Sequence, residues 1–136
     1  MDTRELTSDA ERRAAVTILR QLWSERDPAD VFAWTGDDDY HLFGGHVDGE
    51  LVGVAGVVLT NVLHHARHAW LYDLVVDEAH RGEGYGTELV NFVEEWAAGR
   101  DCERVALASP REKERTHRFY EELEYERWGY VVEREL

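Results

Sequence analysis

Glycines occupy alternate positions in the segment Arg81–Thr87, which separates an apolar run from a helix-periodic one. Glycine lets the main chain curve tightly and approach a ligand closely, because it has no side chain. The first N–H groups of a helix lack intrahelical acceptors and carry a partial positive charge, so they attract an anion. Arg81 adds a permanent positive charge at the entrance of this loop. We therefore predict a site for a phosphate or pyrophosphate in this segment.

The glycine spacing distinguishes this loop from two common phosphate-binding motifs. A P-loop ends in Gly-Lys-Ser or Gly-Lys-Thr, and no lysine follows these glycines. A dinucleotide fingerprint has the spacing Gly-x-Gly-x-x-Gly early in a strand–helix–strand unit, whereas this loop comes late in the chain. The pattern Arg-x-x-Gly-x-Gly is satisfied by Arg81, Gly84 and Gly86. A tight strand-to-helix turn with incidental glycines is the structural alternative.

The elements that precede the loop are predicted from periodicity and turn signals. Apolar residues recur at helical spacing from Ser8 to about Arg26, with Ser8 and Glu11 as a capping box, and a second short helix follows over residues 27–34. The pair Asp48-Gly49 predicts a hairpin, because both turn residues need a positive φ. The strands are expected at Tyr40–Val47, Glu50–Leu59 and Ala69–Val76, with a loop over residues 60–68.

The elements after the loop continue the alternation of helix and strand. We expect a helix at Thr87–Ala98 ended by Gly99, and then a strand from about Arg104 to Ser109. A helix from Pro110 to about Leu123 follows, and residues 127–136 are predicted to close the chain as a strand. This order predicts one α/β (α+β) domain over residues 1–136, with a mixed sheet covered by helices.

Two blocks of this chain, Asp73–Val90 and Val105–Tyr125, resemble the GNAT superfamily of N-acetyltransferases. The resemblance extends from the Asp48-Gly49 hairpin to the C-terminus, and the two N-terminal helices suit the same layout. It implies a mixed, mostly antiparallel and twisted sheet in which a splayed strand pair forms a slot. Acetyl-coenzyme A (acetyl-CoA) would occupy that slot as the co-substrate.

The resemblance also implies which residues bind acetyl-CoA. The strand before the loop would pair with the pantetheine arm through its main chain, and the loop would hold the pyrophosphate. Glu83 is an unfavourable neighbour for phosphate, so we expect its side chain to point to solvent. Lys113 stands where an asparagine is common in the family; it would reach a coenzyme phosphate, or else lie on a solvated helix face. The implied cofactor-binding residues are Leu74, Val75, Val76, Arg81, Gly82, Glu83, Gly84, Tyr85, Gly86, Thr87 and Lys113.

The second block implies the general acid. Phe119 and Tyr120 match the aromatic pair of the family, so Tyr120 would protonate the leaving thiolate; a core aromatic beside Phe119 is the alternative. The main-chain N–H of Val76, at a strand bulge, would stabilise the charge on the carbonyl oxygen. Glu124 stands where a glycine is usual, which leaves the local turn open.

The general base is not assigned by the sequence. By parity with Leu74 and Val76, the residues that face the slot are Trp70 and Tyr72, the expected substrate contacts, and neither is a good base. Asp73 falls on the other face unless a bulge reverses the parity, and it is expected to bond the main chain. A histidine of the preceding loop or a chain of waters is the remaining option. The histidines are His64, His65 and His68; no metal is expected, since no carboxylate or cysteine spacing accompanies them.

Composition excludes several classes of protein. The net charge of −14, with Lys113 the only lysine, excludes a nucleic-acid-binding role, because the chain repels phosphate backbones. The acidic residues are spread along the chain, which favours a salt-adapted (halophilic) surface over an electrostatic funnel for a cationic substrate.

No apolar run has the roughly 20 residues of a membrane span. The single cysteine, Cys102, fits a reducing cytoplasm and is expected to be a small buried or half-buried filler.

These observations lead to one functional expectation and one alternative. We expect an acetyl-CoA-dependent N-acetyltransferase that acts on a primary amine of a small molecule or peptide, as a cytoplasmic monomer or homodimer. The alternative is a catalytically idle acyl-CoA-binding sensor or partner-binding module on the same fold. Amine-dependent thiol release distinguishes the two.

Overall fold

The computed structural model describes all residues from Met1 to Leu136 and divides into two compact units, Met1–Ala106 and Leu107–Leu136. The assignment of a single domain to residues 1–136 therefore stays a prediction. None of the helices combines the length and the apolar character that a membrane crossing requires.

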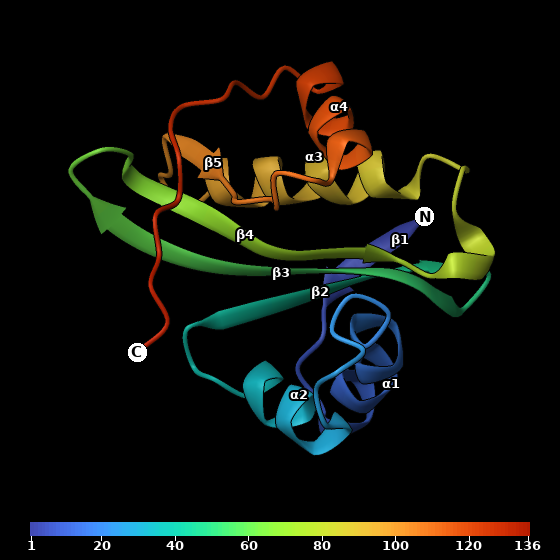
Figure 1. Ribbon diagram of the computed structural model, residues 1–136. Helices are drawn as coiled ribbons and strands as arrows, with labels where there is room; N and C mark the ends of the chain where they lie inside the picture. The colour runs from blue at the N-terminus through green and yellow to red at the C-terminus, as the bar shows by residue number, and fades with distance from the viewer. The chain divides into compact units, whose positions relative to one another are not determined.

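The first unit is built on a five-stranded sheet with the strand order β1-β2-β3-β4-β5 (Figure 1). Neighbours from β1 to β4 are antiparallel, and β5 runs parallel to β4. This arrangement confirms the expected mixed, mostly antiparallel sheet. The strands are β1 (Asp2–Glu5), β2 (Tyr40–Val47), β3 (Glu50–Val62), β4 (Ala66–Val76) and β5 (Arg104–Ala106).

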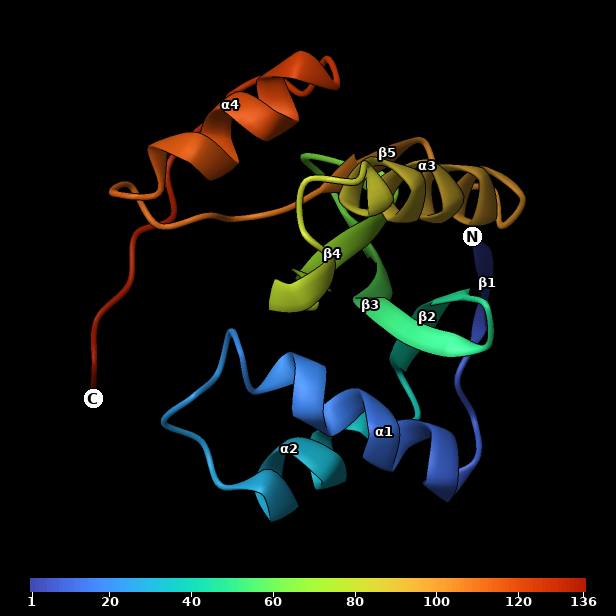
Figure 2. The same ribbon diagram turned by 90° about the vertical axis from the view of Figure 1, so that its right-hand side faces the viewer.

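Helices cover both faces of this sheet. Figures 1 and 2 show α1 (Asp9–Leu19) and α2 (Pro28–Thr35) on one face and α3 (Tyr85–Ala98) on the other. On the first face, the buried side of α1 packs with Val54 and Val75 in one apolar cluster. On the α3 face, the ring of Phe43 lies 5.3 Å from that of Phe92 and 4.9 Å from that of Trp96, measured between centroids.

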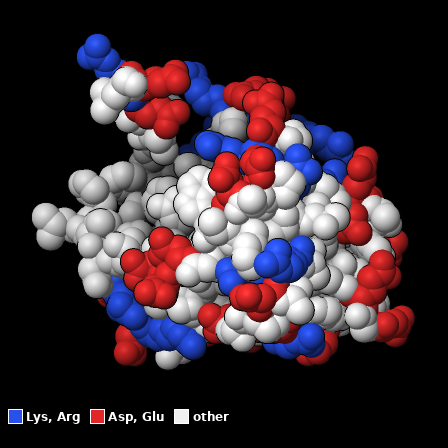
Figure 3. Space-filling view, turned by 90° about the horizontal axis from the view of Figure 1, so that it is seen from below, with Lys and Arg blue, Asp and Glu red and all other residues white.

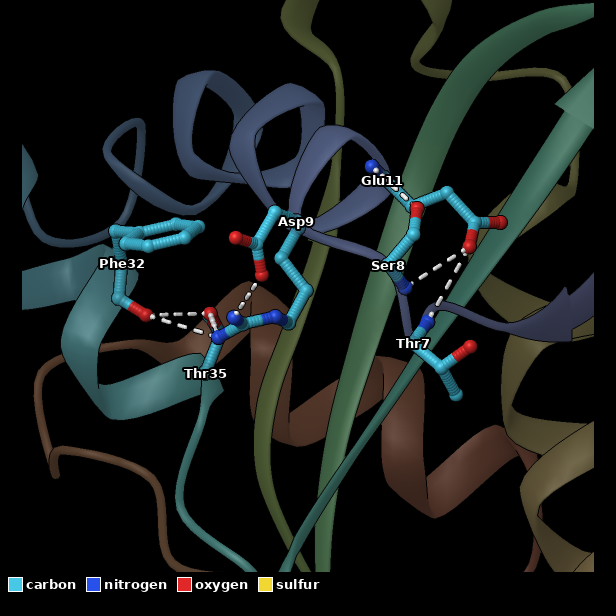
Figure 4. Close-up of polar contacts among 7 residues, drawn as sticks. Thr7, Ser8, Asp9, Glu11, Phe32 and Thr35 are labelled. Atoms are coloured by element: carbon cyan, nitrogen blue, oxygen red, sulfur yellow. Dashed lines mark hydrogen bonds and ion pairs between the residues drawn. The ribbon is translucent and has the colours of Figure 1, made fainter.

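The start of α1 confirms the predicted capping box. The Ser8 hydroxyl accepts from the Glu11 N–H at 3.1 Å, and the Glu11 carboxylate accepts from the Ser8 N–H at 3.1 Å (Figure 4). These hydrogen bonds lower the pKa of Glu11. One turn on, the Arg12 guanidinium donates to the Thr35 hydroxyl at 3.2 Å and to Asp9 at 2.8 Å. Arg12 thereby links α1 to the end of α2.

Four boundaries in the first unit differ from the sequence-based expectations. Helix α1 ends at Leu19 and hydrogen-bonded turns replace its expected continuation to Arg26. The expected loop over residues 60–68 is wrong, because β3 and β4 pair as far as Val62 and Ala66. Cross-strand pairing here outweighs the polar composition that suggested a loop. Strand β5 stops at Ala106 rather than Ser109, and β1 was not expected, since its exposed polar residues show no alternation.

The second unit contains one helix, α4 (Glu114–Glu122), which begins four residues later than the expected Pro110 start. The expected strand over residues 127–136 is wrong, because this segment pairs with no other strand. Alternating apolar residues indicate β propensity, but a strand also requires a hydrogen-bonded neighbour.

Helix α4 ends in a Schellman motif centred on Glu124. The Tyr125 N–H donates to the Tyr120 carbonyl, and the Glu124 N–H donates to the Glu121 carbonyl, both at 3.0 Å. The rings of Tyr120 and Tyr125 are in contact, with centroids 5.4 Å apart, as this motif favours. Glu124 has a φ of 68°, a left-handed conformation that glycine adopts without strain. Glu124 therefore makes a turn that suits the glycine expected at this position.

Replacing Glu124 by glycine should stabilise the protein. Glu124→Gly removes the steric cost of a left-handed residue, so the free energy of unfolding should rise by about 0.5–1 kcal/mol. Urea unfolding of the full chain measures the change. Glu122→Gly, at the last residue of α4, is the matched control and should lower stability, because a residue with helical φ gains nothing from glycine. A loss of stability in Glu124→Gly would contradict the assignment of strain to this residue.

Candidate active site

The loop between β4 and α3 presents unpaired main-chain donors. After η1 (Glu78–His80), Gly82 and Gly84 have φ values of 84° and 85°, and Gly84 caps α3 in the left-handed conformation. A Cβ atom built on either glycine would meet nothing within 4 Å, so the space beside the loop is open. The N–H groups of Tyr85, Gly86 and Thr87, in the first turn of α3, have no intrahelical acceptor, because the first bond of the helix runs from the Glu88 N–H to the Gly84 carbonyl. These donors suit an anion such as phosphate.

The charges around the loop also suit an anion. Arg81 is exposed, and its Nε donates to the Val76 carbonyl at 3.0 Å, which holds the guanidinium at the end of β4. Glu83 is exposed to solvent as expected. The partial positive charge of the α3 N-terminus lies at the same loop. Tyr85, Gly86 and Thr87 form the first turn of that helix.

One edge of β4 beside the loop is free of a strand. β5 pairs only with His68–Trp70, and no strand pairs with Leu71–Val76 on that side. Leu74, Val75 and Val76, the predicted pantetheine contacts, lie in this free stretch. An extended ligand adds to such an edge through main-chain hydrogen bonds.

A β-bulge at Tyr72 overturns the parity argument made from the sequence. Gly56 pairs with Asp73 and Val57 pairs with Leu71, which leaves Tyr72 as the extra residue of β4. A bulge places two consecutive residues against one partner and changes which face the following residues occupy. The expected bulge near Val76 is therefore misplaced, since Val76 pairs regularly with Gly53.

The bulge brings Asp73 to the same face as Trp70, contrary to the expectation. Trp70, Val58 and Tyr40 are neighbours across three strands, and cross-strand neighbours share a face. The Tyr40 hydroxyl donates to Asp73 Oδ2 at 2.7 Å, so Asp73 lies on that face too. The parity argument had assumed that Trp70 and Tyr72 share the face of Leu74 and Val76, and this assumption is wrong.

Two side chains distant in sequence hold the Asp73 carboxylate. Trp23 Nε1 donates to Asp73 Oδ1 at 2.6 Å, and Tyr40 donates to the other oxygen. The expected main-chain partner of Asp73 is therefore wrong. Gly56 makes this geometry possible, because a Cβ at position 56 would overlap the Tyr40 hydroxyl. The three residues Trp23, Tyr40 and Asp73 are called the Asp73 cluster below.

The Asp73 cluster should weaken the protein at alkaline pH. Burial, and secondarily the charge of Asp73, raise the pKa of Tyr40 well above its usual value. Unfolded tyrosine ionises above pH about 10 while folded Tyr40 keeps its proton, so the stability it contributes is present below that pH and is lost as pH rises. Each such tyrosine lowers the free energy of unfolding by about 1.4 kcal/mol per pH unit.

Urea unfolding between about pH 9 and 11 measures this effect. The Tyr40→Phe variant should lose stability with pH less steeply than the wild type. Tyr130→Phe, which alters an exposed tyrosine, is the matched control and should leave the slope unchanged. Equal slopes in the wild type and Tyr40→Phe would contradict the raised pKa.

Aromatic rings border the Asp73 cluster along β4. The rings of Trp70 and Tyr72 have centroids 6.0 Å apart, and Tyr72 is 58% exposed. His68 is only 1% exposed and its Nδ1 lies 3.3 Å from the Ala66 carbonyl, which makes it a poor candidate for an accessible base. Desolvation, with His68, Arg104 and His64, lowers the pKa of His65. Asp73 is the carboxylate that lies on the same face as Trp70.

In the second unit, Tyr120 packs with aromatic neighbours. Its ring centroid lies 5.0 Å from that of Phe119 and 5.4 Å from that of Tyr125. Burial raises the pKa of Tyr120, so its hydroxyl stays protonated at neutral pH. A protonated phenol is the form that a general acid requires. Lys113 is exposed and immediately precedes α4.

Trp23 and Tyr40 were not expected as partners of the site. They lie 50 and 33 residues from Asp73 in the chain. No local motif marks either residue. The one signal in the sequence was an acidic residue, Asp73, next to two aromatic residues of the same strand, Trp70 and Tyr72. Only the bulge, which the strand pairing determines, places Asp73 on the face of Trp70.

The chain is similar in sequence to known proteins. A family model described as "Acetyltransferase (GNAT) family" matches residues 4–125. The chain is 26% identical over 134 residues to an uncharacterized N-acetyltransferase, YhdJ, of Bacillus subtilis (strain 168), covering 96% of this chain and 92% of the relative.

Solved structures share the fold. An aminoglycoside antibiotic 6'-N-acetyltransferase from Acinetobacter haemolyticus superposes with a TM-score of 0.86 at 17% identity, covering 100% of this chain and 98% of that one. An aminoglycoside N-acetyltransferase crystallised with CoA gives a TM-score of 0.85 at 19% identity, covering 99% of this chain and 93% of that one.

Proposed function

Because the chain belongs to the acetyltransferase (GNAT) family, we propose that it transfers the acetyl group of acetyl-CoA to a primary amine of a small molecule or peptide. The observation that carries the proposal is the β4–α3 loop. Its unbonded N–H groups at the start of α3 lie next to the free edge of β4. An extended thioester that carries phosphates needs both features, because the edge binds its extended arm and the N–H groups bind its phosphates.

The residues of this loop fit coenzyme A. Gly82 and Gly84 leave open space where a side chain would block a phosphate, and Arg81 supplies a positive charge. The proposed contacts are the main chain of Leu74, Val75 and Val76 for the pantetheine arm, and residues 81–87 for the pyrophosphate. Lys113 is proposed as a further phosphate contact. Bound acetyl-CoA supplies an acetyl thioester whose C–S bond breaks as the new N–C bond forms.

The acceptor amine is proposed to bind at the Asp73 cluster. An amine arrives mostly as an ammonium ion, and the Asp73 carboxylate attracts that charge. The faces of Trp70 and Tyr72 favour a cation beside them. Asp73 then takes the ammonium proton, directly or through a water, which frees the nitrogen lone pair for attack. Trp23 and Tyr40 donate to the two oxygens of Asp73 and so fix the orientation of the carboxylate.

Two further groups complete the proposed reaction. The Val76 N–H donates to the carbonyl oxygen as negative charge develops on it. Tyr120 donates its proton to the leaving thiolate and recovers one from solvent. The thiolate leaves as a thiol, so the proton released at the ammonium balances the proton delivered to sulfur.

A thiol-release assay tests the proposed function. Purified protein, acetyl-CoA and a panel of primary amines should give thiol release that depends on both the amine and the protein, with the acetylated amine identified by mass spectrometry. Asp73→Asn keeps the shape of the side chain but removes both the charge and the group that takes the proton, so it should raise the KM of the amine by about tenfold or more and lower turnover by roughly a hundredfold. CoA binding without amine-dependent release for any amine would favour the idle sensor instead.

Salt dependence tests the origin of the acidic surface. In Figure 3, acidic side chains lie dispersed over the face shown, interrupted by basic and uncharged groups, which supports salt adaptation rather than steering. Activity should therefore climb with potassium chloride and follow the folded fraction measured by circular dichroism. Steering would instead give activity that peaks at low salt in a folded protein, because screening shortens to about 3 Å at molar strength.

A further inference from the structure

The turn that follows α1 reaches the β4–α3 loop through one side chain, Gln21. Its Nε2 donates to Asp77 Oδ1 at 3.0 Å, and its Oε1 accepts from the Glu78 N–H at 2.9 Å. The same oxygen accepts from Arg81 Nη2 at 3.4 Å. In Figure 2 the segment between α1 and α2 rises toward the end of β4, where this loop begins. An exposed glutamine thus makes three hydrogen bonds to a segment 56 to 60 residues away in sequence.

The Gln21 amide stands between two opposite charges. Its NH2 group faces the Asp77 carboxylate and its carbonyl oxygen faces the Arg81 guanidinium, and no ion pair joins Asp77 to Arg81. Asp77 is further engaged by the Ala79 N–H at 3.4 Å and lies 3.3 Å from His80 Nδ1. The neutral amide satisfies both groups without cancelling the charge of either.

This arrangement leaves most of the Arg81 guanidinium available. Arginine has five N–H groups, of which one donates to the Val76 carbonyl and one to Gln21, so three remain. A direct pair with Asp77 would occupy two of them in a bidentate contact and neutralise the charge that a phosphate needs. Glutamine at position 21 therefore keeps the Arg81 guanidinium available, whereas an acidic or a short side chain at this position would not.

We propose that Gln21 is a positioning residue for coenzyme binding, which keeps Arg81 apart from Asp77 so that the guanidinium faces the pyrophosphate. The proposal rests on the proposed function, because it requires that the loop binds coenzyme A. Without the Gln21 side chain, Arg81 pairs with Asp77 and the loop loses its permanent positive charge. Gln21 touches no reacting atom.

Calorimetry with coenzyme A tests the proposal in four variants. Gln21→Ala should weaken binding by about three- to tenfold, and Gln21→Glu by more, because a carboxylate at position 21 pairs with Arg81 directly. Asp77→Asn added to Gln21→Ala should restore the affinity to within about twofold of the wild type, since the competing charge is gone. Thr17→Ala, one turn earlier on α1 at an exposed position, is the matched control and should bind like the wild type.

A second readout separates positioning from a general loss of structure. S-acetylpantetheine carries the thioester but no pyrophosphate, so its turnover should be the same in Gln21→Ala and the wild type, whereas the KM for acetyl-CoA should rise. Unchanged coenzyme affinity in Gln21→Ala, or a loss that Asp77→Asn does not reverse, would overturn the proposal. Failure of the wild type to bind coenzyme A would instead overturn the proposed function itself.

Discussion

Gly84→Asp should strongly weaken coenzyme A binding while the protein stays folded. Gly84 has a φ of 85°, and aspartate is among the few residues that tolerate this conformation. Its side chain would enter the open space beside the free N–H groups, where nothing lies within 4 Å. A carboxylate about 4 Å from a phosphate repels it by about 1–4 kcal/mol, so affinity should fall by about fivefold to several hundredfold. Calorimetry measures the affinity and circular dichroism the fold.

Gly49→Asp is the matched control for this experiment. Gly49 has a φ of 81° and also has nothing within 4 Å of a built Cβ, but it lies in the hairpin turn between β2 and β3. The control adds the same charge and a similar backbone strain away from the loop. Coenzyme A binding should survive in Gly49→Asp. Binding that persists in Gly84→Asp would show that the glycine loop does not hold the pyrophosphate.

Tyr120→Phe should lower turnover by roughly a hundredfold or more, the typical effect of losing a general acid. The substitution keeps the ring and its contacts with Phe119 and Tyr125 and removes only the hydroxyl. Coenzyme A affinity should therefore change little. Because burial raises the pKa of Tyr120, the hydroxyl keeps its proton and the defect should persist at every pH of a normal assay range. Steady-state thiol release from pH 6 to about 9 measures it.

The control for Tyr120→Phe is Tyr130→Phe, which removes the hydroxyl of a tyrosine that is 88% exposed in the same unit. Turnover should be unaffected by the control. If Tyr120→Phe turns over like the wild type across the pH range, Tyr120 is a packing residue and another group, such as water, protonates the thiolate.

Features that depend on neighbouring residues were predictable from the sequence alone. The Ser8–Glu11 capping box forms between residues three apart, and Asp48 and Gly49 both take the positive φ that their turn requires. The glycine loop is local in the same way, because strand, turn and helix start follow one another within the stretch from Leu74 to Thr87. Local sterics and hydrogen bonding decide such features, so residue types and spacing suffice to predict them.

The acceptor side of the candidate site was decided by the tertiary structure. One extra residue in β4, Tyr72, moves Asp73 to the face of Trp70, and a bulge depends on how two strands pair. Trp23 and Tyr40 reach Asp73 from other elements, and Gln21 reaches the β4–α3 loop in the same manner. The segment 127–136 has strand-like residues but no strand neighbour. Pairing and long-range contacts are set by the packing of distant segments, which no local pattern encodes.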